Sequence, residues 1–450
     1  MKFIVAGAGT VGYDIARQLI KEGMDVIVIE KDPVRAKFLE SDLDCIVINS
    51  EANSHQTLKE ADLQAGDYFV AVTESDEVNL VACSIASVFG DITKIARVRN
   101  LEYSHAEVCG KPFLGADYAV SPEIEAAKQI SDIIEKGAVT DVLTFEGTEI
   151  TVREGVIEAK SIFKNKSLMK AKKEVNRQFL IPLIKRGEKE IIPSGSTVLK
   201  ENDTIFITAD SETMDYILAK TGKKVKKVKS AFIVGTTRIA RNLLRTLASK
   251  PINLKIVVEN YEEAKEISRA FPNVLVINGD VRDESVFEEE KLSEADLIVT
   301  VTDNQELNVI TALYAKNSGV GRAIAAVNKH TYTSIAQKLG VDVTISPKQS
   351  AVDAILKYIK KGNIKTFYSL LEGDAEAIEI VVTEKSTVKE KMIKDLKMPS
   401  DSIIAAVNRD KKVFIPDGKF KLEVNDSVVI VMKSRVASKI ETIFSNSDEY

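Results

Sequence analysis

Three closely spaced glycines near the N-terminus are the residues of this chain whose types and spacing best suit the binding of a phosphate. Gly7, Gly9 and Gly12 follow an apolar run at residues 3–6 and precede a stretch with apolar residues at helical spacing. This order predicts a buried strand, a tight turn and a helix whose N-terminal N–H groups can bind an anion. Gly7 would permit the turn, Gly9 would let a phosphate approach the backbone, and Gly12 would let the helix pack closely on the sheet.

An acidic residue stands where the sugar of a nucleotide would need it. Glu30 follows a second apolar run at residues 26–29, and it comes about 20 residues after the glycines, as in dinucleotide-binding folds. A carboxylate there can accept hydrogen bonds from both ribose hydroxyls and would repel a 2′-phosphate. We therefore expect NAD(H), or another adenine nucleotide with an unmodified ribose, rather than NADP. The alternative is a structural turn that binds no ligand.

Apolar runs and helical stretches alternate through the first 137 residues, which predicts an α/β fold with a doubly wound parallel sheet of the Rossmann type. Ligands of such sheets bind at the carboxyl ends of the strands, where several polar residues fall. Arg97 is among them, as a phosphate or ribose contact or, alternatively, as a solvated surface arginine. The candidates by position are Gly7, Ala8, Gly9, Thr10, Val11, Gly12, Glu30, Asn49, Thr73 and Arg97.

Composition excludes several classes of protein. The 450 residues include 62 Lys and Arg against 67 Asp and Glu, a net charge of −5, whereas proteins that bind nucleic acid need a basic surface. The three cysteines are odd in number and lack C-x-x-C spacing, so neither a disulfide framework nor a metal site is expected. No apolar stretch reaches membrane-spanning length and no secretory signal opens the chain, so we expect a cytoplasmic protein.

Short runs with strand-like alternation begin near residue 139, separated by turn residues such as Gly187, Gly195 and Asn202-Asp203. They predict a small, mainly β module. Six lysines then fall within residues 220–229. We expect this tract to be a solvated linker, with contact to anionic lipid or nucleic acid as the alternatives.

The whole pattern then recurs with a period of about 225 to 229 residues. Residues 231–235 match residues 3–7, Glu259 matches Glu30, and residues 301–308 match residues 72–79. The β module recurs as well, which predicts a two-part unit present twice. The expected domains are a Rossmann domain at 1–137, a β module at 138–221, a lysine-rich linker at 222–229, a second Rossmann domain at 230–362 and a second β module at 363–450.

The second copy differs from the first at its glycine turn. Thr237 places a side chain where Gly9 has none, so a dinucleotide would fit less well, although Arg238 and Arg241 could meet a phosphate as charges. A degenerate pocket and a working nucleotide site both remain open. The second-site candidates are Gly235, Thr236, Thr237, Arg238, Ile239 and Glu259.

Over almost its whole length the chain resembles the TrkA family of Trk potassium-uptake regulators, which carry two tandem RCK (KTN) units. The residues that carry the resemblance are the glycine turn, Glu30, the string VAVTESDEVNLVAC at 70–83, IARVRN at 95–100, Ser121-Pro122 and the paired β modules. The string at 70–83 is more specific than the glycines, because ordinary dehydrogenases lack it. Position by position, the family's nucleotide contacts would fall on residues 7–11, Glu30, Thr73, Glu74 and Arg97.

The resemblance implies a regulatory subunit without catalytic activity. It would bind NAD(H), or ATP and ADP, and assemble as a homo-oligomer, expected to be a tetrameric ring. It would sit on the cytoplasmic face of the membrane, as a peripheral protein bound to a potassium translocator of the TrkH or TrkG type. Regulation of a Ktr-type channel or a cation/proton antiporter is an alternative, although the tandem repeat favours the Trk type.

A less favoured alternative is an NAD-dependent oxidoreductase. Such an enzyme needs a substrate domain with a general acid or base near the nicotinamide, whereas a small β module follows the first Rossmann unit. His55, His105 and His330 lie in polar surroundings without a paired carboxylate motif, which favours surface histidines.

Overall fold

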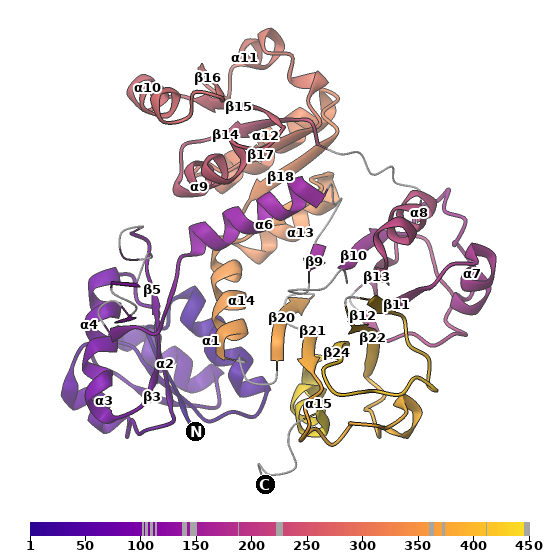
Figure 1. The fold of residues 1–450 in the computed structure, drawn as a ribbon. Helices are drawn as coiled ribbons and strands as arrows, with labels where there is room; N and C mark the ends of the chain where they lie inside the picture. Colours follow the sequence, from indigo (N-terminus) through magenta and orange to yellow (C-terminus); the bar gives the residue numbers. More distant parts are fainter. Residues whose placement is uncertain are drawn as a thin grey trace. The chain divides into compact units, whose positions relative to one another are not determined.

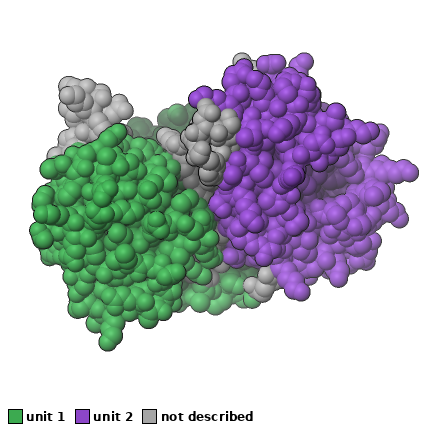
Figure 2. All heavy atoms as spheres, turned by 90° about the horizontal axis from the view of Figure 1, so that it is seen from below, with its two compact units in different colours: residues 1–134, 228–359 green, residues 135–227, 360–450 purple. Residues whose placement is uncertain are grey.

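The structure is a computed structural model of the full chain, and it describes residues 1–100, 103, 107–108, 111–112, 115–136, 142–144, 151–187, 189–221, 228–359, 364–370, 374–410 and 412–444. These residues form two compact units (Figures 1 and 2). Unit 1 consists of residues 1–134 and 228–359, and unit 2 of residues 135–227 and 360–450. Each unit therefore combines matching parts from both copies of the repeat.

The first sheet of unit 1 is parallel and has the Rossmann strand order, with the switch in direction between β1 and β4. Its strands across the sheet are β3 (Ile46–Ile48), β2 (Val26–Ile29), β1 (Phe3–Ala6), β4 (Tyr68–Ala71), β5 (Thr93–Arg97) and β8 (Tyr118–Val120). The helices of this copy are α1 (Thr10–Lys21), α2 (Pro33–Asp42), α3 (His55–Glu60), α4 (Asp76–Ala86) and α6 (Pro122–Lys136).

The second sheet of unit 1 repeats the same parallel order, which confirms the predicted repeat of the Rossmann fold. Its strands are β16 (Leu275–Asn278), β15 (Asn253–Val258), β14 (Ser230–Val234), β17 (Leu297–Thr300), β18 (Arg322–Ala326) and β19 (Val343–Ile345). Its helices are α9 (Arg238–Leu247), α10 (Tyr261–Ala270), α11 (Glu284–Glu289), α12 (Gln305–Asn317), α13 (His330–Leu339) and α14 (Pro347–Ile359).

Helix α14 belongs to the second copy but packs on the first, beside α1 and β8 (Figure 1). The ring of Tyr358 stacks on Tyr118 with 4.4 Å between centroids and 6° between planes. Burial raises the pKa of Tyr118 to about 12. At the other end of the helix, the Ser350 hydroxyl donates to the Gln129 side chain at 2.7 Å. The two copies therefore share side-chain contacts within unit 1.

Unit 2 contains the two small, mainly β modules that the sequence predicts, and the sheet of each is antiparallel. The first has β12 (Lys189–Ile191), β11 (Phe179–Arg186), β13 (Thr204–Ala209), β10 (Thr151–Val156) and β9 (Val142–Thr144), with α7 (Leu168–Val175) and α8 (Ser211–Thr221). The second has β20 (Ile364–Leu370), β21 (Ala375–Val381), β24 (Ser427–Lys433), β22 (Ser402–Arg409) and β23 (Lys412–Phe414), with α15 (Ala437–Phe444). Buried side chains of both sheets, among them Val152, Phe206 and Val429, form one shared core.

Part of the lysine-rich tract, residues 222–227, lies outside the described residues, as do His105 and Cys109. Among the described residues, no helix combines the length and the apolar character needed to cross a bilayer.

Candidate nucleotide-binding site

A cavity of about 820 Å³ opens at the carboxyl edge of the first Rossmann sheet, beside the switch between β1 and β4. Its wall combines the glycine turn, the end of β2, the segment after β3, the segment after β4 and the end of β5. The lining residues are Gly7, Gly9, Thr10, Val11, Ile29, Glu30, Lys31, Asp32, Arg35, Ser50, Glu51, Ala52, Asn53, Val72, Thr73, Glu74, Ser75, Val78, Arg97, Arg99 and Lys348. Cavities of this size accommodate drug-sized ligands.

The glycine turn has the geometry that close approach of a phosphate requires. Gly7 has φ +95°, in the region that favours glycine. A Cβ on Gly12 would lie 1.8 Å from the Gly7 carbonyl oxygen, whereas a Cβ on Gly9 would point into open space. Gly9 is also the N-cap of α1 and supplies no side-chain cap, and the first turn of α1 contains no acidic residue. The N–H groups of that turn are therefore available to an anion.

Glu30 is buried at the end of β2, with 7% of its surface exposed, and it holds the turn in place. One carboxylate oxygen accepts from the Ala8 N–H at 2.7 Å, and the other accepts from the Asp32 N–H at 2.9 Å. A carboxylate has about four lone-pair sites, so each oxygen can accept a further hydrogen bond, and Glu30 lines the cavity. This arrangement fits a ribose with free hydroxyl groups.

Asn79 fastens together the strand ends that form the floor of the cavity. Its side-chain oxygen accepts from the N–H and the hydroxyl of Thr73 at 2.9 and 2.6 Å, and its amide group donates to the Arg97 carbonyl at 2.8 Å. Asn308 makes the same bonds to Thr302 and Ala326 in the second copy. Both asparagines are buried. Because both copies have these bonds, we assign Asn79 a structural role: it positions Thr73 and Arg97.

Three cations line the cavity: Arg97 on β5, Arg99 just after it, and Lys348 on α14. No carboxylate of the described residues forms an ion pair with any of the three, and Nε of Arg97 and of Arg99 is buried without a hydrogen-bond partner. Burial, followed by the charge of Arg99, lowers the pKa of Arg97, while Glu123 opposes this shift. Lys348 Nζ lies 3.2 Å from the Thr10 hydroxyl. The cavity is also lined by carboxylates, Glu74 among them, but these three cations form no ion pair within the described part of the chain and can meet an anionic ligand.

The structure brings most of the predicted contacts to one cavity. Gly7, Gly9, Thr10, Val11, Glu30, Thr73, Glu74 and Arg97 line it. Ala8, Gly12 and Asn49 do not: Ala8 binds Glu30, Gly12 packs on Gly7, and the Asn49 amide donates to the Glu30 and Lys31 carbonyls at 2.7 and 3.1 Å.

Sequence reasoning missed Arg99, Lys348 and the segment 50–53 as parts of this wall. Arg99 lies two residues beyond Arg97, so the alternation of the strand end could have indicated it. Lys348 lies in the other copy of the repeat, and nothing in the sequence links it to this cavity.

The corresponding region of the second copy is built differently. Its cavity, of about 540 Å³, is lined by Thr236, Thr237, Arg238 and Ile239, but neither Gly235 nor Glu259 reaches it. The Thr237 hydroxyl donates to the Val301 carbonyl at 2.6 Å, and the Thr236 hydroxyl donates to Glu263 at 2.7 Å.

The carboxylate that could bind a ribose in the second copy has another partner. Glu259 pairs with Arg282 at 3.1 Å, and Arg282 also pairs with Asp280 at 2.7 Å. Both threonine hydroxyls of this turn therefore already have acceptors, and the position equivalent to Glu30 lies outside the cavity. Arg97, Arg99 and Lys348 line this cavity as well as the first.

Replacing Asn79 and Asn308 in turn distinguishes an effect on stability from an effect on nucleotide binding. We expect Asn79→Ala to lower the free energy of unfolding by about 2 kcal/mol, because buried groups of Thr73 and Arg97 lose their partner, and to weaken nucleotide binding severalfold. Asn308→Ala should cost a similar stability and leave binding unchanged. Chemical denaturation and calorimetric titration measure the two effects, and equal loss of binding in both variants would contradict this assignment.

The fold and the cavity define the class: two Rossmann domains in tandem, each followed by a small antiparallel module, with a nucleotide-type turn kept in the first copy. The TrkA-N domain family matches residues 3–122 and 231–347, and the TrkA-C domain family matches residues 152–222 and 377–445. The chain therefore belongs to the TrkA family, with each of the two domains present twice, as the resemblance implied.

Named relatives match over nearly the full length. The chain is 30% identical to "Trk system potassium uptake protein TrkA homolog 1" of Methanosarcina mazei, covering 99% of this chain and 100% of that protein. It is 28% identical to "Trk system potassium uptake protein TrkA" of Vibrio alginolyticus, covering 99% of both chains.

Solved structures share the fold at lower identity. The GsuK RCK domain matches with a TM-score of 0.57 and 15% identity, covering 98% of this chain and 94% of that one. A structure titled "GsuK channel bound to NAD" matches with a TM-score of 0.58 and 14% identity, covering 98% and 78%. The fold is thus that of a tandem RCK protein.

Proposed function

We propose that this protein is a cytoplasmic, nucleotide-binding regulatory subunit of a Trk-type potassium uptake system. The observation that carries the proposal is the first-copy cavity, which is lined by an open glycine turn, a ribose-type carboxylate and cations that form no ion pair with the described carboxylates. The relatives' names connect the family with potassium uptake. Those names describe transport and no chemical reaction, which supports a regulator rather than an enzyme.

The first site fits NAD(H), and ATP or ADP share the adenosine and phosphate groups that it would hold. Glu30 would accept hydrogen bonds from the ribose, and the N–H groups at the start of α1 would bind the phosphates. The same cavity is lined by Thr73, Glu74 and Arg97. The similar GsuK channel has been solved with NAD, which supports the dinucleotide. The second turn, whose threonine hydroxyls donate to the Val301 carbonyl and to Glu263, is proposed to bind no adenosine.

Regulation requires that the ligand bind two conformations with different affinity, because equal affinity shifts no equilibrium. The proposed partner is an integral membrane potassium translocator of the TrkH or TrkG type, on whose inner face the protein would assemble as a homo-oligomeric ring. Several linked copies would add their small differences in binding free energy.

The test measures potassium current through the reconstituted translocator with this protein, adding NADH, NAD, ATP or ADP. We expect at least one nucleotide to change the current severalfold, with no turnover of the nucleotide. An unchanged current with every nucleotide would refute the regulatory role, and hydride transfer would favour the oxidoreductase. Co-purification with a Ktr-type channel or an antiporter instead would redirect the assignment of the partner.

A further inference from the structure

Helix α14 carries a second-copy lysine to the nucleotide turn of the first copy. Lys348 lies near the N-terminus of α14 and donates to the hydroxyl of Thr10, the first residue of α1. Thr10 stands at the helix N-terminus where phosphates bind in this fold. Lys348 therefore already lies at the phosphate end of the cavity, and a phosphate could replace the Thr10 hydroxyl as its partner.

The rest of α14 is anchored to the first copy. Tyr358 stacks on Tyr118, Ser350 bonds to Gln129, and the Tyr68 hydroxyl donates to the Ile359 carbonyl at 3.4 Å. Of its 13 residues, six are buried. These contacts join α14 to the first copy near both of its ends.

The second copy, meanwhile, has lost the features that would let its own turn bind a nucleotide. Thr237 bonds to the Val301 carbonyl, and Glu259 pairs with Arg282. The position in the first copy that matches Lys348 is Glu123, which lines the second cavity and carries the opposite charge. The two copies thus differ in both the turn and the residue presented across it.

We infer that Lys348 is a ligand-binding residue of the first-copy site, supplied by the second copy, and that it couples the phosphate charge of the bound nucleotide to α14. The ligand class is a nucleotide with at least two phosphates. This inference rests on the proposed function of the first site. Arg97 and Arg99 lie on the same wall, so a bound polyphosphate would offset three positive charges, and charge-assisted hydrogen bonds are the strong ones.

The experiment uses the full chain with NADH and ADP as probes. In calorimetric titration, Lys348→Gln should weaken both ligands by about tenfold, the effect of one charge-assisted hydrogen bond, whereas Lys348→Arg should stay within about threefold of the wild type. Lys357→Gln is the matched control, because it makes the same change on the same helix away from both cavities. It should bind like the wild type.

A second readout tests the coupling. Saturating NADH should slow hydrogen exchange in residues 347–359 of the wild type and of Lys357→Gln, but not of Lys348→Gln at equal occupancy. If Lys348→Gln binds and protects α14 like the wild type, the inference is wrong while the nucleotide site stands. If the wild-type chain binds no nucleotide at all, the proposed function fails and the inference fails with it.

Discussion

The variant Gly9→Asp is expected to bind NADH at least 100-fold more weakly than the wild type. Gly9 adopts φ −60° and ψ −176°, a conformation open to any residue, and its missing Cβ would point into open space. The substitution should therefore fold normally and place a carboxylate where the phosphates would lie. Repulsion between like charges, added to steric block, makes a loss of about 2.7 kcal/mol or more reasonable.

Gly9→Ala is the matched control for backbone effects. It adds a Cβ at the same point without charge, so we expect a loss of about tenfold or less and unchanged thermal stability. Calorimetric titration gives affinity and stoichiometry together. The wild type should bind one nucleotide per chain, because the second turn has Thr237 in place of Gly9, and its two threonine hydroxyls donate to the Val301 carbonyl and to Glu263.

The complementary variant is Thr237→Gly, which removes the side chain that bonds to the Val301 carbonyl. It should leave the stoichiometry at one, because Glu259 stays paired with Arg282 and the ribose position is not restored. A stoichiometry of two in the wild type, or full binding by Gly9→Asp, would place the nucleotide elsewhere in the chain.

Local sequence patterns predicted the helices and strands whose formation depends on neighbouring residues in the chain. Asp32 followed by Pro33 predicts the start of a helix, and the structure has Asp32 as the N-cap of α2, accepting from the Val34 and Arg35 N–H groups at 2.8 and 3.1 Å. The alternation of apolar runs with helices predicted both parallel sheets, because the apolar runs of central strands such as β1 and β17 are buried in the core. The edge strands β3 and β16 are more exposed, with Ile46 and Leu275 at 63% and 49%.

The parts of the site that sequence could not reveal depend on contacts between distant segments. Lys348 and Thr10 are 338 residues apart along the chain, and their proximity follows from the docking of α14 on the first copy. Asn49 shows the opposite limit: its place at a strand end suggested a ligand contact, but its amide bonds to the Glu30 and Lys31 carbonyls. A residue type at a strand end does not tell which way its hydrogen bonds point.

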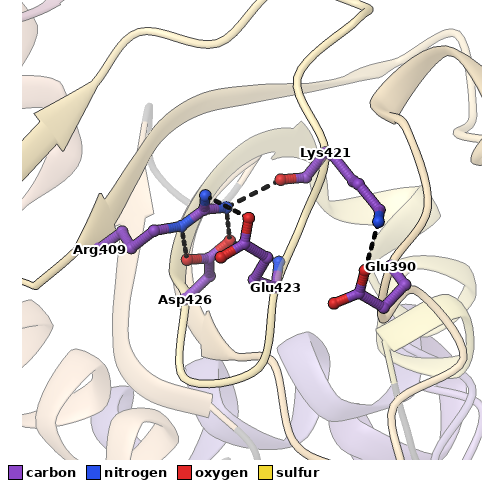
Figure 3. Close-up of polar contacts among 5 residues, drawn as sticks. All are labelled: Glu390, Arg409, Lys421, Glu423 and Asp426. Carbon is purple, nitrogen blue, oxygen red and sulfur yellow. Dashed lines mark hydrogen bonds and ion pairs between the residues drawn. The ribbon is translucent and has the colours of Figure 1, made fainter.

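The second large effect is expected in unit 2, where Asp426→Asn should destabilise the second β module by about 2 to 3 kcal/mol. Asp426 is fully buried in the turn before β24, and both its oxygens accept from Arg409 at 2.7 Å (Figure 3). One oxygen also accepts from the Glu423 N–H at 2.8 Å. Arg409 further contacts the Glu423 carboxylate and the Lys421 carbonyl.

This arrangement is worth more than a surface ion pair. Arg409 has 26% of its side chain exposed while Asp426 has none. The pKa of Arg409 is raised chiefly by the hydrogen bonds that it donates to Asp426. Removing one partner of a buried pair typically costs about 3 to 5 kcal/mol, and the partial exposure of Arg409 reduces that range. Asn keeps the shape of the side chain but cannot accept both bonds from the guanidinium.

The first β module contains an equivalent buried pair, and the second Rossmann domain contains an exposed pair that serves as a control. Arg186 and Asp203 form the same two bonds at 2.7 Å, so Asp203→Asn should destabilise its module equally. Asp280→Asn breaks a pair with Arg282 whose side chains are 38% and 64% exposed, and exposed pairs contribute about 0 to 1 kcal/mol. Native-state hydrogen exchange of β22 and β24 reads the second module separately from unit 1.

If Asp426→Asn lowers the free energy of unfolding no more than Asp280→Asn does, then the two-bond pair of Arg409 and Asp426 does not stabilise the module. The presence of the same pair in both copies would then need another explanation. The expected difference between the two variants bears on why some features are the same in both copies and others are not. The buried Arg–Asp pair and the buried asparagine, Asn79 or Asn308, are the same in both copies because each copy must fold. A glycine turn that differs between the copies is what we expect if one nucleotide site per chain, to which the second copy contributes Lys348, is sufficient.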